Sequence, residues 1–406
     1  MSAPLPYSPP AKAERIPYGT LTEIAGIQVG VAAAGIRPSG GLDLLVLSHP
    51  GAAVAGVTTR STAVAAPCKW TRSLLPGFAD ALVVNAGNAN AATGTQGEAD
   101  AQATAERAAA ALGTTPERVL LASTGVIGRM LPMDKVFAGV DAACAALRPH
   151  AGHAAACAIL TTDSGPKEVA FQAGGVKVAG IAKGAGMIHP NMATMLSFIA
   201  TDAKVAPEHL QAILKPAVDR SFNALSVDGD SSTNDTVVLI ATGKGAELAP
   251  GAPGWAELVL ALESTCTHLA QAIAADGEGA TTLIEAVVEG PSESEGRALA
   301  RAVVKSNLVK AAVHGRDPNW GRIVGALGQA QAHGLDALNL DIGGVPVVRE
   351  GQPLPLESEK VAQAMQQPQL RLHIQLPADP SAPGLARAWG CDLSAEYVRI
   401  NADYTS

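Results

Sequence analysis

The chain has 406 residues, 48% of them hydrophobic and only 3% aromatic, and its formal net charge is −8. This composition is globular and excludes a disordered chain, and the core must be built mainly from Ala, Val, Leu and Ile. The acidic balance argues against general nucleic-acid binding, because an acidic surface repels phosphate backbones. Five cysteines are scattered singly, which argues against a disulfide framework and a structural zinc site.

Residues 1–15 are rich in Pro and Ala and are expected to form a loose arm without an export signal. No later apolar stretch is expected to span a membrane, because Gly, Thr and Asn interrupt each one. The sequence therefore predicts a cytoplasmic protein with no membrane partner.

Apolar runs and helix-forming stretches alternate along the rest of the chain, which favours an α/β architecture. Strands are expected at Gly26–Ala32, Leu42–Leu47, Ala52–Thr58, Ala81–Val84, Val119–Ala122, Val176–Ile181, Val237–Ala241 and Leu283–Val288. Helices are expected at Glu98–Leu112, Lys135–Leu147, Pro207–Phe222, Trp255–Ala274, Leu299–Lys305 and Glu357–Met365. The stretch Gly290–Gly296, with Pro, Ser, Glu and Gly, is the best linker candidate.

The most informative segment is K-G-A-G-M-I-H-P-N-M-A-T-M-L-S, from Lys183 to Ser197. It follows an expected strand and is dense in Gly, Met and Asn, which is poor for a helix and suits a tight turn. Glycines 184 and 186 could suggest a phosphate loop. Neither the full P-loop pattern nor a Rossmann G-x-G-x-x-G is present, however.

Five further segments accompany this run: N-A-G-N-A-N at 85–90, S-T-G-V-I-G at 123–128, D-G-D-S-S-T-N-D at 228–235, G-R-D-P-N-W-G at 315–321 and N-A-D-Y-T-S at 401–406. With them the chain resembles, over essentially its whole length, the ornithine acetyltransferases of arginine biosynthesis (the bifunctional glutamate N-acetyltransferase family). The combination of motifs is highly specific.

The resemblance implies autocatalytic cleavage between Ala193 and Thr194, with Thr194 as the nucleophile of the processed enzyme. A threonine hydroxyl needs an adjacent base. The freed α-amine has a reference pKa of about 7.7–8.0 and can take the hydroxyl proton. The implied reaction moves acetyl from N2-acetyl-L-ornithine to L-glutamate through acetyl-Thr194, in a ping-pong cycle of arginine biosynthesis. Acetyl-CoA is a second candidate donor.

The resemblance also assigns the site residues. Thr124 and Gly125 are implied to stabilise the oxyanion. Substrate binding is implied for Thr162, Lys183, Thr194, Glu278, Asn401 and Ser406. Lys183 is the expected partner of the substrate α-carboxylate, and Glu278 could pair with a substrate ammonium. No cofactor and no metal are expected.

The implied fold is the layered α/β/β/α sandwich of the self-processing aminopeptidase and ornithine acetyltransferase type. The sandwich is expected over residues 1–288. A smaller α/β domain is expected over 297–406, with its tail returning to the active site. Cleavage would leave an α chain of residues 1–193 and a β chain from 194, and the expected assembly is a heterotetramer of two of each.

Two alternatives stay open. One is an N-terminal-nucleophile aminopeptidase or amidase, which would use water as the acyl acceptor. The other is a non-enzymatic member that only binds amino acids. The 228–235 loop is expected to give structural support near the site, because it lacks the spacing and terminal glutamate of a calcium loop. The 314–321 loop could reach either the site or an interface.

Overall fold

The computed structural model describes residues 13–189, 195–355 and 357–403. The larger of its two sheets has nine strands, and these come from the first two thirds of the chain. In sheet order they are β1 (Glu14–Arg15), β6 (Lys167–Ala173), β7 (Val176–Lys183), β8 (Leu196–Thr201), β10 (Thr236–Ala241), β3 (Leu44–Thr58), β4 (Gly77–Asn88) and β5 (Val119–Val126), with β2 (Gln28–Ala32) paired to β3.

This sheet folds over on itself about the long strand β3, so that its two halves form two facing layers. The first part of β3 pairs with β2 and β4, and the last part pairs with β10. Successive side chains of a strand point to opposite faces of the sheet, so one strand can contribute to two cores. In β3, Leu45 and Leu47 enter a core shared with Phe198 of β8, whereas Leu44 and Val46 enter a different core. Because both faces of these strands are buried, their sequences are nearly continuous apolar runs.

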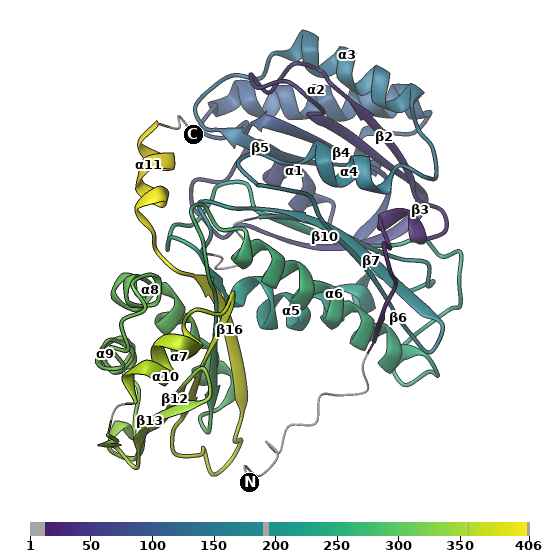
Figure 1. Cartoon of the computed structure of the whole chain (residues 1–406). Helices are drawn as coiled ribbons and strands as arrows, with labels where there is room; N and C mark the ends of the chain where they lie inside the picture. Colours follow the sequence, from purple (N-terminus) through teal and green to yellow (C-terminus); the bar gives the residue numbers. More distant parts are fainter. Residues whose placement is uncertain (1–12, 190–194, 356, 404–406) are drawn as a thin grey trace.

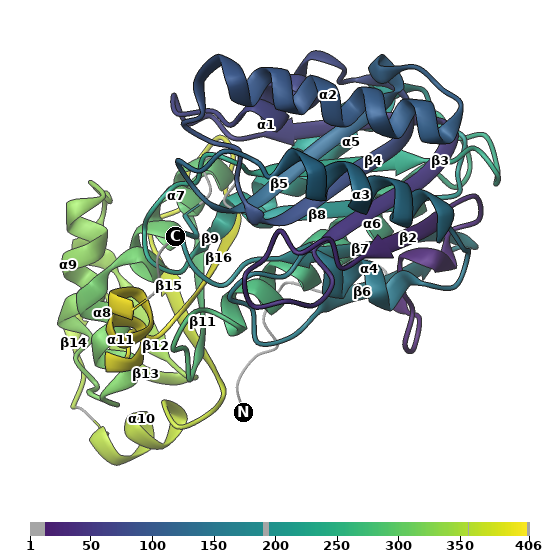
Figure 2. The same cartoon turned by 90° about the horizontal axis from the view of Figure 1, so that it is seen from above.

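Helices cover the two outer faces of the layers, as Figures 1 and 2 show. One outer core contains the first β layer with α2 (Gly94–Leu112) and α3 (Met133–Ala145). The other contains the second layer with α5 (Pro207–Arg220) and α6 (Trp255–Ala275). The shorter helices α1 (Ala66–Ser73) and α4 (Gly152–Ala158) lie beside the same strands. The predicted α/β/β/α sandwich is confirmed.

The second sheet has seven strands and belongs mostly to the C-terminal third. In order they are β14 (Gln352–Pro353), β13 (Val345–Arg349), β12 (Asn339–Ile342), β15 (Gln369–Gln375), β11 (Leu283–Glu289), β16 (Leu385–Cys391) and β9 (Leu225–Ser226). Its region also contains α7 (Glu293–Lys305), α8 (Asn307–His314), α9 (Gly321–Gln329), α10 (Ser358–Ala364) and α11 (Ala395–Asp403). Short 3-10 helices lie at Leu21–Glu23, Pro116–Arg118, Phe222–Ala224 and Leu335–Ala337.

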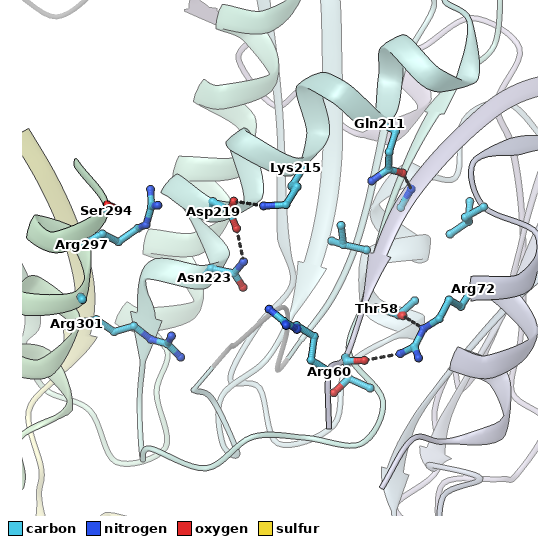
Figure 3. Close-up of a pocket in the computed structure, with 15 residues that line it drawn as sticks. Thr58, Arg60, Arg72, Gln211, Lys215, Asp219, Asn223, Ser294, Arg297 and Arg301 are labelled. Atoms are coloured by element: carbon cyan, nitrogen blue, oxygen red, sulfur yellow. Dashed lines mark hydrogen bonds and ion pairs between the residues drawn. The ribbon is translucent and has the colours of Figure 1, made fainter. Parts of the chain in front are cut away.

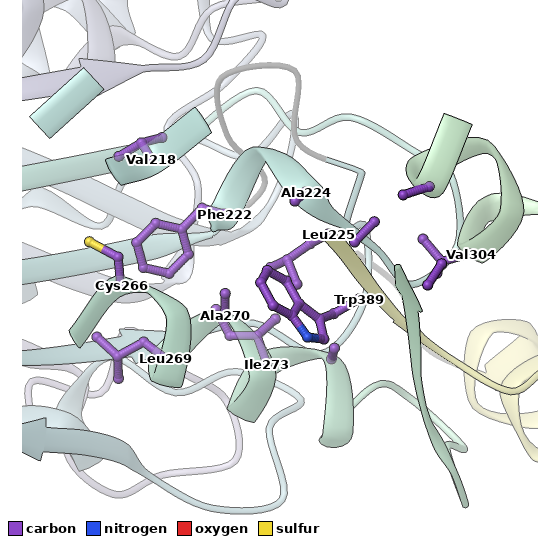
Figure 4. Close-up of a cluster of buried hydrophobic side chains, with 14 of the residues drawn as sticks. Val218, Phe222, Ala224, Leu225, Cys266, Leu269, Ala270, Ile273, Val304 and Trp389 are labelled. Carbon is purple, nitrogen blue, oxygen red and sulfur yellow. The ribbon is translucent and has the colours of Figure 1, made fainter. Parts of the chain in front are cut away.

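A shared apolar cluster joins the second sheet to the sandwich. Trp389 of β16 is fully buried against α6 residues such as Ile273, and Leu225 of β9 lies beside it (Figure 4). Burying an aromatic side chain of this size removes roughly 150–250 Å² of surface from water, so this contact is a major part of the joint. The division at 288 stays a prediction, although β9 and β11 both pair within the second sheet.

Several sequence-based expectations need correction. The runs Leu42–Leu47 and Ala52–Thr58 are parts of one strand, because the irregular register between Ser48 and Ala52 bends β3 without ending it. The expected linker Gly290–Gly296 contains the start of α7. Ser292 caps that helix by accepting from the Glu295 N–H at 3.4 Å.

Two expectations at the periphery also change. Residues 14–15 of the expected arm form β1, which pairs with β6, while residues 1–12 lie outside the described residues. Helix α6 is long and apolar enough, by length and composition, to cross a membrane, contrary to the expectation that no stretch would be. Half of the most apolar stretch of α6 is buried, and the helix packs on β6 and β7, which is typical of a core helix.

Candidate active site

A cavity of about 110 Å³ lies beside the ends of β5 and β7 and the start of β8. Six of the eight predicted site residues line it: Thr124, Gly125, Thr162, Lys183, Glu278 and Asn401. The other two, Thr194 and Ser406, lie outside the described residues. Met195 and Leu196, which follow the predicted nucleophile in sequence, also line the cavity.

Lys183 ends β7 and is the buried cation of this cavity. Its ammonium donates to Thr124 Oγ1 and to Thr161 Oγ1, both at 2.9 Å. Burial lowers the pKa of Lys183, and the nearby Asp163 carboxylate opposes that shift. The cation is therefore held by hydroxyls on two neighbouring segments.

Asp163 and Lys167 form the support beneath Lys183. The Asp163 side chain is fully buried and accepts from Lys167 Nζ at 2.7 Å and from the Gly184 N–H at 2.6 Å. Lys167 Nζ also contacts Asp276 Oδ2 at 2.5 Å, just after α6. Burial opposes ionisation of Asp163, but Lys183 and Lys167 together lower its pKa. These ion pairs hold the 183–184 turn against the end of α6.

A side chain does not fit at the position of Gly125. Its φ is +130°, a conformation that L residues rarely adopt, and an added Cβ would lie 2.3 Å from the carbonyl carbon of Gly87. The pairing of β5 with β4 is irregular at this point. The S-T-G end of β5 thus brings its backbone close to the neighbouring strand at the cavity wall.

Glu278 provides the buried carboxylate of the cavity. Its carboxylate packs on Gly186, where an added Cβ would lie 2.4 Å from the carboxylate carbon, so a larger residue there would displace the Glu278 side chain. The C-terminal helix reaches the same group: Asn401 Nδ2 donates to Glu278 Oε2 at 2.8 Å. Ser394, just before α11, donates to the Gly279 carbonyl at 2.6 Å and fixes the approach of the helix.

Asp235 is a second buried carboxyl group in the cavity wall. Its Oδ2 has no hydrogen-bond partner, and burial raises its pKa well above the usual range, with Lys183 opposing the shift. A buried carboxyl without a full set of donors is more stable in its neutral form. Burial therefore favours the neutral form of Asp235 at the cavity wall.

The 228–235 loop also supports the site through its other side chains. Asp228 accepts from the backbone N–H groups of Met187 and Ile188, at 2.6 and 2.9 Å. Asn234 donates to the Ser123 carbonyl at 2.9 Å. These contacts join the Gly-rich run to the end of β5, in agreement with the structural role expected for the loop.

His189, to which the sequence gives no catalytic role, lies 3.1 Å from Ser226 Oγ. Burial, together with Arg301 and Lys305, lowers the pKa of His189 to about 3, so its ring is neutral at physiological pH. Among the described residues no group of three or more His, Cys, Asp or Glu side chains could hold a metal ion.

Four polar residues line the cavity without a site role in the sequence analysis: Thr161, Ser232, Asn234 and Asp235. Thr161 adjoins the predicted Thr162, and it is Thr161 whose hydroxyl contacts Lys183. Asn234 and Asp235 end a motif that was noticed but assigned to support alone. Their place directly before β10 was the available signal, because strand ends are where α/β folds place functional side chains.

The layered fold with this cavity at its strand ends belongs to the class of α/β/β/α sandwiches that the sequence predicts. The ArgJ family model matches residues 28–406. The arginine biosynthesis bifunctional protein ArgJ of Thermosynechococcus vestitus is 45% identical over 96% of this chain and 98% of its own. That of Parasynechococcus marenigrum is 46% identical over 96% of each chain. The chain belongs to the ArgJ family.

Solved structures are similar to parts of the chain. A crystal structure of arginine biosynthesis bifunctional protein argJ from Bacillus halodurans is 39% identical, with a TM-score of 0.50, over 52% of this chain and 100% of its own. A structure of ornithine acetyltransferase complexed with ornithine from Mycobacterium tuberculosis is 42% identical over 45% of this chain and all of its own, with a TM-score of 0.43.

Proposed function

We propose that this chain is a glutamate N-acetyltransferase of arginine biosynthesis, which transfers acetyl from N2-acetyl-L-ornithine to L-glutamate. The observation that carries the proposal is the cavity that joins Lys183, Thr124 and Glu278 in a chain of the ArgJ family. It offers a buried cation and a buried carboxylate, which suit the α-carboxylate and ammonium of small amino-acid substrates.

The nucleophile is the Thr194 hydroxyl, freed by cleavage of the Ala193–Thr194 bond. Met195 and Leu196, which follow Thr194 in sequence, line the cavity, and this supports Thr194 as the nucleophile. Cutting before Thr194 leaves pieces of 193 and 213 residues.

The reaction proceeds by two acyl transfers. The α-amine of Thr194 takes the hydroxyl proton as Thr194 Oγ1 attacks the acetyl carbonyl of N-acetylornithine. The tetrahedral intermediate collapses, the C–N bond breaks, and ornithine leaves with that proton. Glutamate then attacks the acetyl ester through its neutral amine and leaves as N-acetylglutamate, which returns the hydroxyl to Thr194.

The oxyanion of each tetrahedral intermediate is stabilised by the Thr124 hydroxyl and the Gly125 N–H. Thr124 Oγ1 accepts a hydrogen bond from Lys183, which leaves its own hydrogen free to donate into the cavity. Gly125, without a side chain, lets a backbone donor approach the reacting carbonyl closely. A preorganised donor of this kind is worth about 10²–10³ in kcat.

The remaining predicted residues bind substrate. Lys183 pairs with the α-carboxylate, and Glu278, oriented by Asn401, pairs with a substrate ammonium. Thr162 and Ser406 complete the proposed set. Acetyl-CoA serves as a second donor, in keeping with the bifunctional names of the relatives. The processed enzyme is cytoplasmic and assembles as a heterotetramer of two α and two β chains.

The test is the intact mass of the purified protein under denaturing conditions, with wild type beside Thr194→Ala and Thr194→Ser. We expect two fragments from wild type, the second beginning Thr-Met-Leu-Ser, two from the serine variant at a slower rate, and one whole chain from the alanine variant. An uncut wild-type chain would refute the N-terminal threonine mechanism.

The acceptor is tested separately, with N-acetylornithine and isotopically labelled glutamate. We expect label in N-acetylglutamate and little free acetate. Release of acetate at the same rate with and without glutamate would favour the aminopeptidase or amidase alternative. Failure to form an acetyl-enzyme would favour a protein that only binds amino acids.

A further inference from the structure

A second, larger cavity lies outside the candidate active site. It has a volume of about 800 Å³ and lies between the end of β3, α1, α5 and α7 (Figure 3). Arg60 and Arg72 enter it from the β3 and α1 side, and Lys215, Arg297 and Arg301 from the α5 and α7 side. No residue of the candidate active site lines it.

The lining of this cavity is strongly cationic in an acidic protein. Five arginine and lysine side chains are accompanied by one carboxylate, that of Asp219, whereas the whole chain has a formal charge of −8. Like charges brought together repel one another, so such a cluster costs folding energy unless something compensates it. The compensation present within the cavity covers only part of the cluster.

Three of the five cations have hydrogen-bond or ion-pair partners within the protein. Lys215 pairs with Asp219 at 2.7 Å, and Arg297 pairs with Glu293 at 3.0 Å. Arg72 donates to Thr58 Oγ1 at 2.7 Å and to the Thr59 carbonyl. Both acceptors of Arg72 are neutral, so they do not offset its positive charge.

Arg60 and Arg301 both line the cavity and form no ion pair with the described residues, and Figure 3 shows them pointing into the same space. Arg301 gives the stronger evidence for a missing anion, because its Nε and one Nη atom are buried without a hydrogen-bond acceptor. Burial lowers its pKa to about 10, so the guanidinium stays charged at neutral pH. A half-buried guanidinium with unused donors is costly, and an anion bound in the cavity would offset its charge.

We propose that this cavity binds the phosphate groups of a coenzyme A thioester, and so serves the second acetyl donor. Several separate guanidinium groups around one space suit a ligand with several phosphates, since each offers forked donors to phosphate oxygens. A single carboxylate would use only one of them. The proposal rests on the proposed function for the fate of the acetyl group, but the binding itself can be tested alone.

The distance to the reacting centre suits such a ligand. Thr58, at the cavity, is the register partner of Thr236, and Thr236 is the partner of Leu196, which lines the candidate active site. Two strand spacings separate Thr58 from Leu196 by about 10 Å. The pantetheine arm is comparable to about four residues of extended chain, or roughly 14 Å. It can therefore span the distance from the cavity to Leu196, which lines the candidate active site.

The chemical step then balances without a further reactant. The thioester C–S bond breaks as a C–O bond forms to Thr194, and the hydroxyl proton passes through the α-amine to the departing thiol. Glutamate takes the acetyl group in the second half of the cycle, as it does with the other donor.

The experiment uses the processed enzyme and the variants Arg60→Gln and Arg301→Gln, with Arg148→Gln as the matched control. Arg148 is exposed and does not line the cavity, and its variant removes the same charge. Arg60 is exposed, so its variant keeps the test sound even if Arg301→Gln folds poorly. The measurements are calorimetric titration with coenzyme A, and the KM values for acetyl-CoA and for N-acetylornithine.

Each cavity variant is expected to raise the coenzyme A Kd and the acetyl-CoA KM about tenfold. The N-acetylornithine KM should change less than twofold, and the control should match wild type throughout. Arginine-dependent binding of coenzyme A by an enzyme that cannot use acetyl-CoA would uphold the cavity assignment while refuting the second donor. Equal coenzyme A affinity in all four proteins, or binding of inorganic phosphate but not coenzyme A, would overturn the proposal.

Discussion

The Lys183 ammonium donates to Thr124 Oγ1 at 2.9 Å, so the buried cation and the proposed oxyanion donor act as one unit. A hydroxyl that accepts from a cation becomes a stronger donor through its own hydrogen, because hydrogen bonds in a chain polarise one another. Both side chains are buried, which strengthens the electrostatic effect. The position of Lys183 therefore bears on the chemistry at Thr124 as well as on substrate binding.

Replacing Thr124 with valine should lower kcat far more than it changes KM. Valine keeps the shape but removes the donor, and we expect a loss of about 10²–10³-fold in kcat with N-acetylornithine and glutamate. Thr124→Ser retains the hydroxyl and should stay within tenfold of wild type. Steady-state kinetics on both substrates measure this, and equal losses in the two variants would show that the hydroxyl is not the oxyanion donor.

Gly125→Ala should prevent correct folding around the cavity. The new Cβ would lie 2.3 Å from the Gly87 carbonyl carbon at a φ of +130°, so the β4–β5 pairing must open. Gly128→Ala is the matched control, since its φ is +77° but no atom lies within 4 Å of the added Cβ. We expect the control to lose about 1–2 kcal/mol of stability from backbone strain alone, and Gly125→Ala to lose clearly more in urea unfolding.

The sequence predicted the elements of the sandwich because their patterns are local. The apolar run at 119–122 and the Ala-rich stretch at 98–112 carry their own periodicity and end signals. It did not predict that β3 continues through Ser48–Gly51, because a bend of this kind is stabilised by partners on two other strands. The start of α7 was missed because Pro, Ser and Glu suit both a linker and a capped first turn.

Within the candidate site, motifs indicated the residues and only the fold could supply their contacts. Lys183 and Glu278 were identified from the family motifs, and the structure places both in one cavity. The raised pKa of Asp235 could not be predicted from its motif, because it follows from complete burial. The same holds for Arg301, whose unused donors depend on the packing of α7.

Asn401→Ala should weaken substrate binding without weakening the fold. The Asn401 side chain orients Glu278 at 2.8 Å but is exposed on α11, so little packing is lost. We expect the KM of N-acetylornithine to rise about tenfold, since a hydrogen bond to a charged group contributes roughly 1.5–3 kcal/mol. Arg399→Ala, on the same helix and paired only with Glu396 among the described residues, is the control and should leave KM unchanged. A fall in melting temperature with an unaltered KM would assign Asn401 a purely structural role.

Asp235→Asn should make stability less dependent on pH. The pKa of Asp235 is raised in the folded state, so the native protein holds this proton while the unfolded chain releases it above a pKa of about 3.9. The stability that protonation contributes is therefore fully present below that value and is lost as pH rises towards the folded pKa. Asparagine is always neutral and avoids this loss.

We expect the free energy of unfolding of the Asp235→Asn variant to increase relative to that of wild type as pH rises from 4 towards 8, in urea titrations. Thr236→Val, beside it on β10, is the control and should shift both ends of the pH range equally. If the two curves for Asp235→Asn and wild type run parallel over the whole range, then Asp235 is ionised in the folded protein.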